Sequence, residues 1–106
     1  MNIFKRLRRF RASLRLAEAV RLADTAHAKT GERYYVMPNG NRGKLIIMDR
    51  CNFRILKRKG YIMNEAKVAD LERECFYCTS YRNGEGKLPD RVVVKKRAEY
   101  CRWLGI

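Results

Sequence analysis

The N-terminal segment alternates apolar and cationic residues at the spacing of an α-helix. Residues 1–21 hold seven Lys or Arg and a single acidic residue, Glu18. Apolar residues recur there at steps of three and four, which places them along one side of a helix: Ile3, Phe4, Leu7, Phe10, Leu14 and Ala17. Such a helix needs an apolar surface for one side and an anionic counterpart for its charge. The sequence therefore indicates a class of partner before it indicates any activity.

The apolar pattern of this segment shifts near its middle. We expect the helix to run from about residue 2 to about residue 28, with Thr30-Gly31 as its stop. Arg21 and Asp24 fall where the first apolar row would continue. A second row starts around the side of the helix, at Leu16, Val20 and Ala23. The helix is therefore expected either to contact two different surfaces or to bend.

Residues 33–48 carry the pattern of a β-hairpin. Segments 33–37 and 44–48 are both β-prone, and turn formers fill positions 38–43 between them. Gly40 and Gly43 can adopt positive φ because they have no Cβ to clash. This hairpin is the firmest local structure that the sequence predicts.

The segment that follows, 49–60, fits two structures. As a helix, it would be capped by Asp49 and closed by Gly60, with cations in its last turn. As a third strand, it would use the alternation of Phe53 and Ile55. We favour the helix because its start and stop signals agree.

The next acidic stretch, 64–74, predicts a further short helix with Asn64 as its cap. Its inner face would hold Val68, Leu71 and Cys75. Residues 75–81 are aromatic and β-prone and predict a short strand, and 82–87 has the composition of a loop.

The C-terminal stretch predicts a helix that begins near Pro89, a residue tolerated in the first turn. We expect its core-facing stripe to consist of Val93, Val94, Ala98, Cys101 and Leu104. Taken together, these elements predict an α+β chain: a long basic amphipathic N-terminal helix over 1–30, then a central β-hairpin, a short helix, a further short helix and strand, and a C-terminal helix within a small domain over 31–106. The two parts are expected to form a single folding unit.

The charge of the chain is extreme for 106 residues, with a net +14 at pH 7 and a pI near 10.2. Such a surface attracts polyanions, above all DNA or RNA. We expect phosphate contacts from three basic groups: Lys5, Arg6, Arg8, Arg9, Arg11 and Arg15; Arg54, Lys57, Arg58 and Lys59; and Lys95, Lys96 and Arg97, with Arg91 and Arg102 beside them.

The aromatic residues of the sheet region allow two interpretations. They would stack on exposed bases if several lay on one open sheet face, or they would fill the core of a small domain, which is the favoured interpretation: Tyr34, Tyr35, Tyr61, Phe76, Tyr77 and Tyr81. No helix-turn-helix spacing or other base-reading motif is recognisable, so strong sequence specificity is not expected.

The four cysteines are expected to be mainly reduced thiols of an intracellular protein. A zinc site built from Cys51, Cys75, Cys78 and Cys101 is geometrically possible, but the spacing has only one C-x-x-C pair. Buried free thiols are the favoured alternative. A thioredoxin-like redox pair is disfavoured because no βαβ pattern surrounds residues 75–78.

Nothing in the sequence predicts catalysis or a cofactor. His27 is the sole histidine, no phosphate-cradling loop occurs, and no nucleophile stands beside a base in a recognisable pattern. The longest strongly apolar run, 45–48, is far too short to cross a bilayer, so no integral membrane segment is expected. We expect a non-enzymatic protein.

The stretches GERYYVMPNGNRGKLIIMDRCNFRILKRKGYI and ECFYCTSYRNGEG, followed by a terminal helix, resemble uncharacterised small basic proteins of bacteriophages and mobile elements of gut bacteria. That resemblance implies no particular activity. It does imply a location in the cytoplasm, or in a virion if the chain is phage-encoded.

Two hypotheses of function follow. The first is a small nucleic-acid-associating accessory protein that binds the phosphate backbone without strong sequence specificity. The alternative is a virion structural component or an inhibitor that binds a protein partner through the apolar row of its first helix: Ile3, Leu7, Phe10 and Leu14. The oligomeric state is left open.

Overall fold

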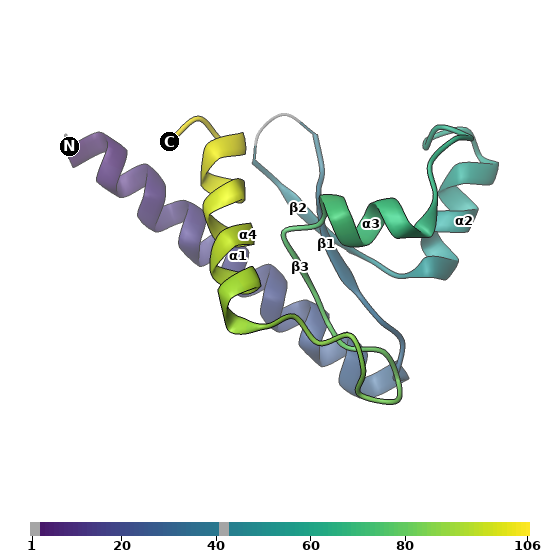
Figure 1. Ribbon diagram of the computed structural model, residues 1–106. Coiled ribbons are helices and arrows are strands. Elements are labelled where there is room, and N and C mark those ends of the chain that lie inside the picture. Colours follow the sequence, from purple (N-terminus) through teal and green to yellow (C-terminus); the bar gives the residue numbers. More distant parts are fainter. Residues whose placement is uncertain (1–2, 41–42) are drawn as a thin grey trace.

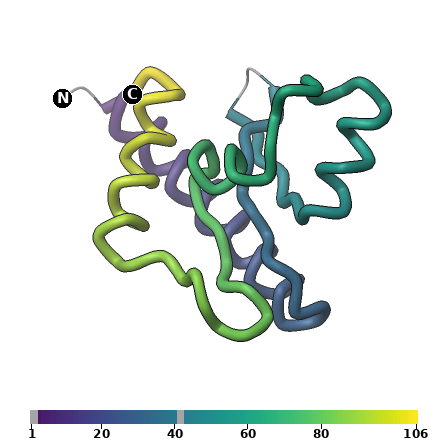
Figure 2. Tube along the Cα trace, turned by 45° about the vertical axis from the view of Figure 1, so that its right-hand side comes forward, coloured from purple at the N-terminus to yellow at the C-terminus, as the bar shows by residue number. Residues whose placement is uncertain are grey.

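The computed structural model describes residues 3–40 and 43–106 and confirms the predicted α+β fold (Figure 1). Within these residues the chain forms four helices and a three-stranded sheet. In chain order they are α1 (Ile3–Thr30), β1 (Tyr35–Pro38), β2 (Leu45–Met48), α2 (Arg50–Arg58), α3 (Val68–Glu74), β3 (Tyr77–Cys78) and α4 (Asp90–Trp103). The N-terminal half of α1 and the C-terminal end of α4 lie at the same end of the molecule (Figures 1 and 2).

The sheet has the order β2-β1-β3, and both pairs of strands are antiparallel. Side chains alternate between its two faces, as the period of a strand requires. Val36 packs in the cluster that includes α1, whereas its neighbour Tyr35 packs in the cluster that includes α2 and α3. Both faces are therefore covered in the described part of the chain, and Tyr35 and Phe76 are core residues rather than a platform for bases.

The predicted hairpin is confirmed, with Tyr35 opposite Met48 and Pro38 opposite Leu45. Gly40 and Gly43 adopt the expected positive φ values of 82° and 75°. Two of the predicted turn formers, at positions 41–42, lie outside the described residues.

The tip of the hairpin is attached to two helices through one backbone carbonyl. Gly43 O accepts a hydrogen bond from Tyr100 Oη at 2.6 Å and another from Arg15 Nη1 at 3.2 Å. A Cβ on Gly43 would lie only 2.5 Å from Leu104 Cδ2 and would displace that side chain, and the positive φ of this residue favours glycine. This carbonyl connects the hairpin to both α1 and α4.

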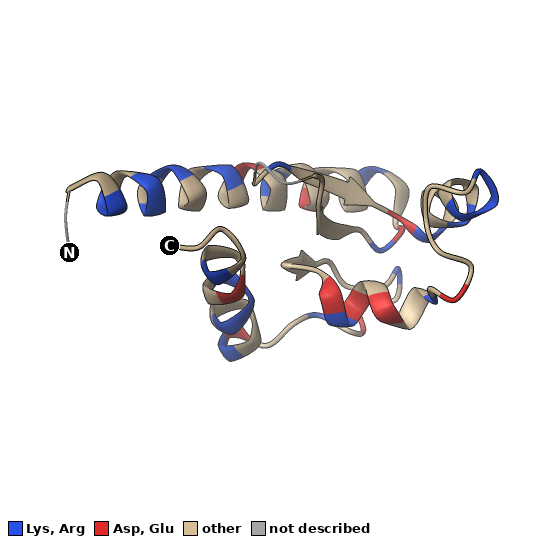
Figure 3. Cartoon of the chain, turned by 90° about the horizontal axis from the view of Figure 1, so that it is seen from above, with Lys and Arg blue, Asp and Glu red and all other residues tan. Residues whose placement is uncertain are grey.

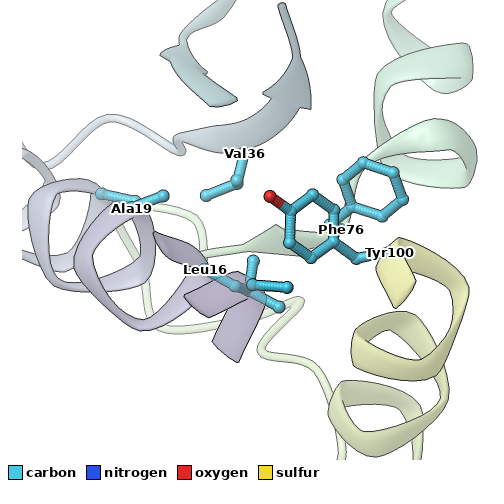
Figure 4. Packing of buried hydrophobic residues seen from close by; sticks show 7 residues of the cluster. Leu16, Ala19, Val36, Phe76 and Tyr100 are labelled. Atoms are coloured by element: carbon cyan, nitrogen blue, oxygen red, sulfur yellow. The ribbon is translucent and has the colours of Figure 1, made fainter. Parts of the chain in front are cut away.

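The side of α1 that packs on the sheet is the second apolar row, not the first. Its buried residues are Ala12, Leu16, Ala19 and Ala23, which join Val36, Phe76 and Tyr100 in one cluster (Figure 4). The rings of Phe76 and Tyr100 pack with their centroids 5.1 Å apart. The first row, Ile3 to Leu14, is exposed and lies on the other side of an unbroken helix.

The segment after the hairpin is a helix, so the strand alternative is wrong. Asp49 caps α2, because its side chain accepts a hydrogen bond of 2.7 Å from Asn52 N. Gly60 follows the helix with a φ of 84°. Phe53 is the buried residue of α2 and packs with Leu71 in the second cluster.

The helix α3 begins three residues later than predicted, and Asn64 is not its cap. The N-cap is Lys67, whose backbone N–H donates to Asp70 Oδ2 at 2.8 Å. This hydrogen bond, with Arg73 nearby, lowers the pKa of Asp70. The preceding loop is held by Lys57, whose Nζ donates to Ala66 O at 2.7 Å. The expected inner face is confirmed at Leu71 and Cys75, and the expected strand follows as β3.

The predicted core stripe of α4 is confirmed only in part: Leu104 packs against the first cluster, and Val93 and Cys101 are half-buried. Val94 and Ala98 are exposed, whereas Lys96 and Tyr100 are the buried residues of this helix. Lys96 Nζ donates to the carbonyls of Glu72 at 3.1 Å, Arg73 at 3.4 Å and Cys75 at 2.9 Å. These carbonyls lie at the C-terminal end of α3, where backbone acceptors lack partners and a positive charge is favourable.

We expect Lys96→Ala to lower the free energy of unfolding by about 2–3 kcal/mol, because it leaves buried carbonyls at the end of α3 without a charged donor. The matched control is Lys95→Ala, since Lys95 is exposed on the same helix. Urea denaturation followed by circular dichroism measures both. Equal stabilities of the two variants would contradict this role of Lys96.

Candidate nucleic-acid interface

The N-terminal turns of α1 project beyond the core, and every residue from Ile3 to Arg11 is exposed (Figure 3). The core begins to cover the helix only at Ala12. The cations that these turns present are Lys5, Arg6, Arg8, Arg9 and Arg11, and no acidic residue lies among them. The predicted concentration of positive charge on this helix is therefore placed on a surface that a partner can reach.

Among the described residues, no carboxylate forms an ion pair with Arg6, Arg8, Arg9 or Arg11. The described ion pairs are Arg21–Glu18, Arg33–Glu72, Arg73–Asp70, Arg73–Glu74 and Arg82–Glu32. The guanidinium groups at the tip of α1 thus keep their charge for an external anion.

A groove between α1 and α4 continues this basic surface. We call it the α1/α4 groove; it has a volume of about 450 Å³. Its cationic lining residues are Arg9, Arg97 and Arg102, and its other lining residues are Ser13, Val94, Ala98, Cys101 and Ile106. A second hollow of about 420 Å³ adjoins it, because Ser13 and Arg97 line both. Sequence reasoning missed the groove, since it assigned Val94 and Ala98 to the core.

Three of the predicted contact residues make hydrogen bonds within the fold. The ammonium of Lys96 is buried among backbone carbonyls, so we remove this residue from the candidate interface. Lys57 is half-buried and holds the loop before α3. Arg15 divides its hydrogen bonds between Gly43 O and Tyr100 Oη. A count of cations in the sequence cannot separate these roles, because the partners lie nine or more residues away along the chain.

The remaining predicted residues form two separate patches. Lys95 and Arg97 are exposed on α4, near α1. Arg54, Arg58 and Lys59 are exposed at α2, which lies at the opposite end of the molecule from the N-terminus of α1 (Figure 3). The longest dimension of the molecule is 43 Å. The predicted contacts are therefore not one continuous surface.

Other candidate groups serve the fold. His27 Nδ1 donates to Glu32 O at 2.7 Å, and its Nε2 lies 3.3 Å from Ser80 Oγ, which ties the end of α1 to the segment after β3. In the described ranges, no three His, Cys, Asp or Glu side chains are grouped as metal ligands, and the four-cysteine zinc site is not formed. Cys51 is exposed, whereas Cys75 and Cys78 are buried.

Comparisons with protein-family models, curated proteins and solved structures give no match to this chain. The resemblance to phage and mobile-element proteins therefore stays a prediction. Among the described helices, none combines the length and the apolar character that crossing a membrane requires.

We expect Arg8→Gln/Arg9→Gln to leave the free energy of unfolding unchanged or slightly raised, because both side chains are exposed and surrounded by like charge. By contrast, Arg15→Gln should lower it by about 1 kcal/mol, since a hydrogen bond to the buried Gly43 carbonyl is lost. Thermal and urea unfolding compare the variants. A loss in the double variant as large as in Arg15→Gln would show that the projecting turns are packed.

Proposed function

We propose that this chain is a non-enzymatic accessory protein that binds the phosphate backbone of nucleic acid without strong sequence specificity. The single observation that carries the proposal is the run of exposed arginines at the tip of α1, with no carboxylate partner among the described residues. Arg97 and Arg102 extend the same surface along the α1/α4 groove. The groups that would meet phosphate are thus on one end of the molecule.

The chemistry of these groups fits phosphate. Guanidinium carries its charge at all physiological pH values and offers paired N–H donors to two oxygens at once. Each phosphate contact releases bound counterions, which supplies affinity that does not depend on base sequence. Phe4 and Phe10 are exposed among the arginines, so their rings are available to unpaired bases. This arrangement favours single-stranded over duplex nucleic acid.

The test is a titration of labelled single-stranded RNA, single-stranded DNA and duplex DNA by fluorescence anisotropy at several salt concentrations. We expect Kd to rise steeply with salt for all three, with the single strands bound more tightly. Arg8→Glu/Arg9→Glu/Arg11→Glu should weaken binding by about 100-fold or more and reduce the salt slope by about one for each lost contact.

The matched control is Arg54→Glu/Arg58→Glu/Lys59→Glu, which changes the net charge by the same amount at α2. We expect it to weaken binding by less than about tenfold, through the long-range field alone. Three outcomes would overturn the proposal: no binding at low salt, an affinity that does not vary with salt, or equal losses in the two triple variants.

A second candidate function is binding of a protein partner by the apolar row of α1, as in a virion component or an inhibitor. The observation that favours it is the exposure of the whole row: Ile3 67%, Leu7 48%, Phe10 60% and Leu14 55%. We expect Leu7→Gln/Phe10→Gln to abolish a complex that survives nuclease digestion, and Arg8→Gln/Arg9→Gln to retain it. If nuclease digestion destroys the complex and the arginine variant also loses it, the partner of α1 is nucleic acid rather than a protein.

A further inference from the structure

A buried guanidinium lies on the side of the sheet away from α1. Arg33, just before β1, is only 4% exposed. Its Cζ lies 4.3 Å from the ring centroid of Tyr81 and 5.4 Å from that of Tyr35. Arginine does not lose its proton in proteins, and a buried charge is costly unless an anion lies close to it. The carboxylate of Glu72 is 3.9 Å away and its side chain is 55% exposed, so it compensates this charge only weakly.

The closer counterpart of Arg33 is a sulfur atom. Arg33 Nη2 donates to Cys78 Sγ at 2.9 Å and to Gly86 O at 3.0 Å. The first distance is short, as hydrogen bonds between charged partners are. Hydrogen bonding from Cys75 and then from Arg33 outweighs burial and lowers the pKa of Cys78 to about 6. The contact with the Arg33 guanidinium therefore favours the thiolate form of Cys78.

The second cysteine of the pair is a thiol beside this thiolate. Cys75 follows α3, and its Sγ lies 3.2 Å from Glu72 O. The neighbouring Cys78 thiolate and burial together raise the pKa of Cys75. A low-pKa thiolate next to a resolving thiol is the arrangement from which intrachain disulfides form. The exposed Cys51 lies on α2 and does not share it.

We propose that Cys75 and Cys78 form a peroxide-reactive dithiol in which Arg33 is the positioning residue that holds the Cys78 sulfur as an anion. Both sulfurs are buried, so the oxidant must be small and uncharged, and hydrogen peroxide is of that class. The inference is independent of the proposed binding of nucleic acid.

The oxidation of the two thiols to a disulfide takes two steps. The Cys78 thiolate attacks one peroxide oxygen, so that an S–O bond forms, the O–O bond breaks, and the released hydroxide takes a proton from solvent to become water. The sulfur is oxidised to a sulfenic acid and the peroxide is reduced. The Cys75 sulfur then attacks Cys78, forming the S–S bond and breaking the S–O bond. The released hydroxide combines with the Cys75 proton as a second water.

The test uses the full chain with Cys51→Ser/Cys101→Ser as background, treated with hydrogen peroxide. We expect intact mass spectrometry to show the loss of two hydrogen atoms, together with loss of both thiols to alkylation and recovery by a dithiol reductant. Adding Cys75→Ser should stop the reaction at a sulfenic acid on Cys78, trapped by dimedone. Adding Cys78→Ser instead should leave Cys75 almost unreactive.

The role of Arg33 is tested by the rate of oxidation by hydrogen peroxide and by the dependence of that rate on pH. Arg33→Met should slow oxidation at pH 7 by about tenfold, because the thiolate fraction falls. Arg33→Lys should restore most of the rate, since it keeps a cation.

Several titratable or charged groups face the pair and enter its pH profile: Arg33, Tyr35, Glu72, Tyr81 and Lys96. In the background protein the rate should be constant above pH 7 and fall as pH drops through about 6.

The pH profile keeps the proposal falsifiable even if Arg33→Met does not fold. A rate that continues to rise up to pH 8–9, as for an ordinary thiol, would overturn the assignment of Cys78 as thiolate. So would sulfenic acid on Cys75 rather than Cys78, or a background protein that peroxide oxidises no faster than free glutathione at the same pH.

Discussion

The close contact of α1 with the sheet determines which parts of this chain stay exposed. Three of the four buried residues on α1 are alanines, whose short side chains bring the helix near Val36 and Phe76. This packing uses one side of the helix and begins at Ala12. The apolar and cationic residues from Ile3 to Arg11 are exposed, so the packing of the core leaves the candidate interface open to a partner.

The parts of the fold that the sequence predicts well are those that depend on neighbouring residues. Asp49 caps α2 through a backbone N–H three residues away, and Gly43 turns the hairpin by its own φ. By contrast, the burial of Lys96 depends on carbonyls 21 to 24 residues earlier. The spacing of the valines in α4 therefore does not identify the buried residues of this helix. A buried lysine cannot be recognised until the end of α3 is placed beside it.

The same distinction applies to the candidate sites. The arginines near the start of α1 can be predicted to lie close together on one helix, because they are neighbours in the sequence. Their exposure follows only from the structure, in which the core begins to cover α1 at Ala12. The pairing of Arg33 with Cys78 spans 45 residues and depends on the β1–β3 register, which sets Tyr35 opposite Cys78. C-x-x-C spacing alone shows that Cys75 and Cys78 are near each other, but not that a buried cation lies against one of them.

The continuity of α1 has a consequence for its own helix–coil equilibrium. The first turn of α1 lacks an acidic residue, and cations stand three or four positions apart along the projecting turns. The helix dipole and the repulsion between these like charges therefore both oppose helix formation there. The packed half of α1 supplies the nucleus from which these turns extend. An arriving polyanion would relieve the repulsion, and part of its binding free energy would then appear as reduced fraying of the helix end.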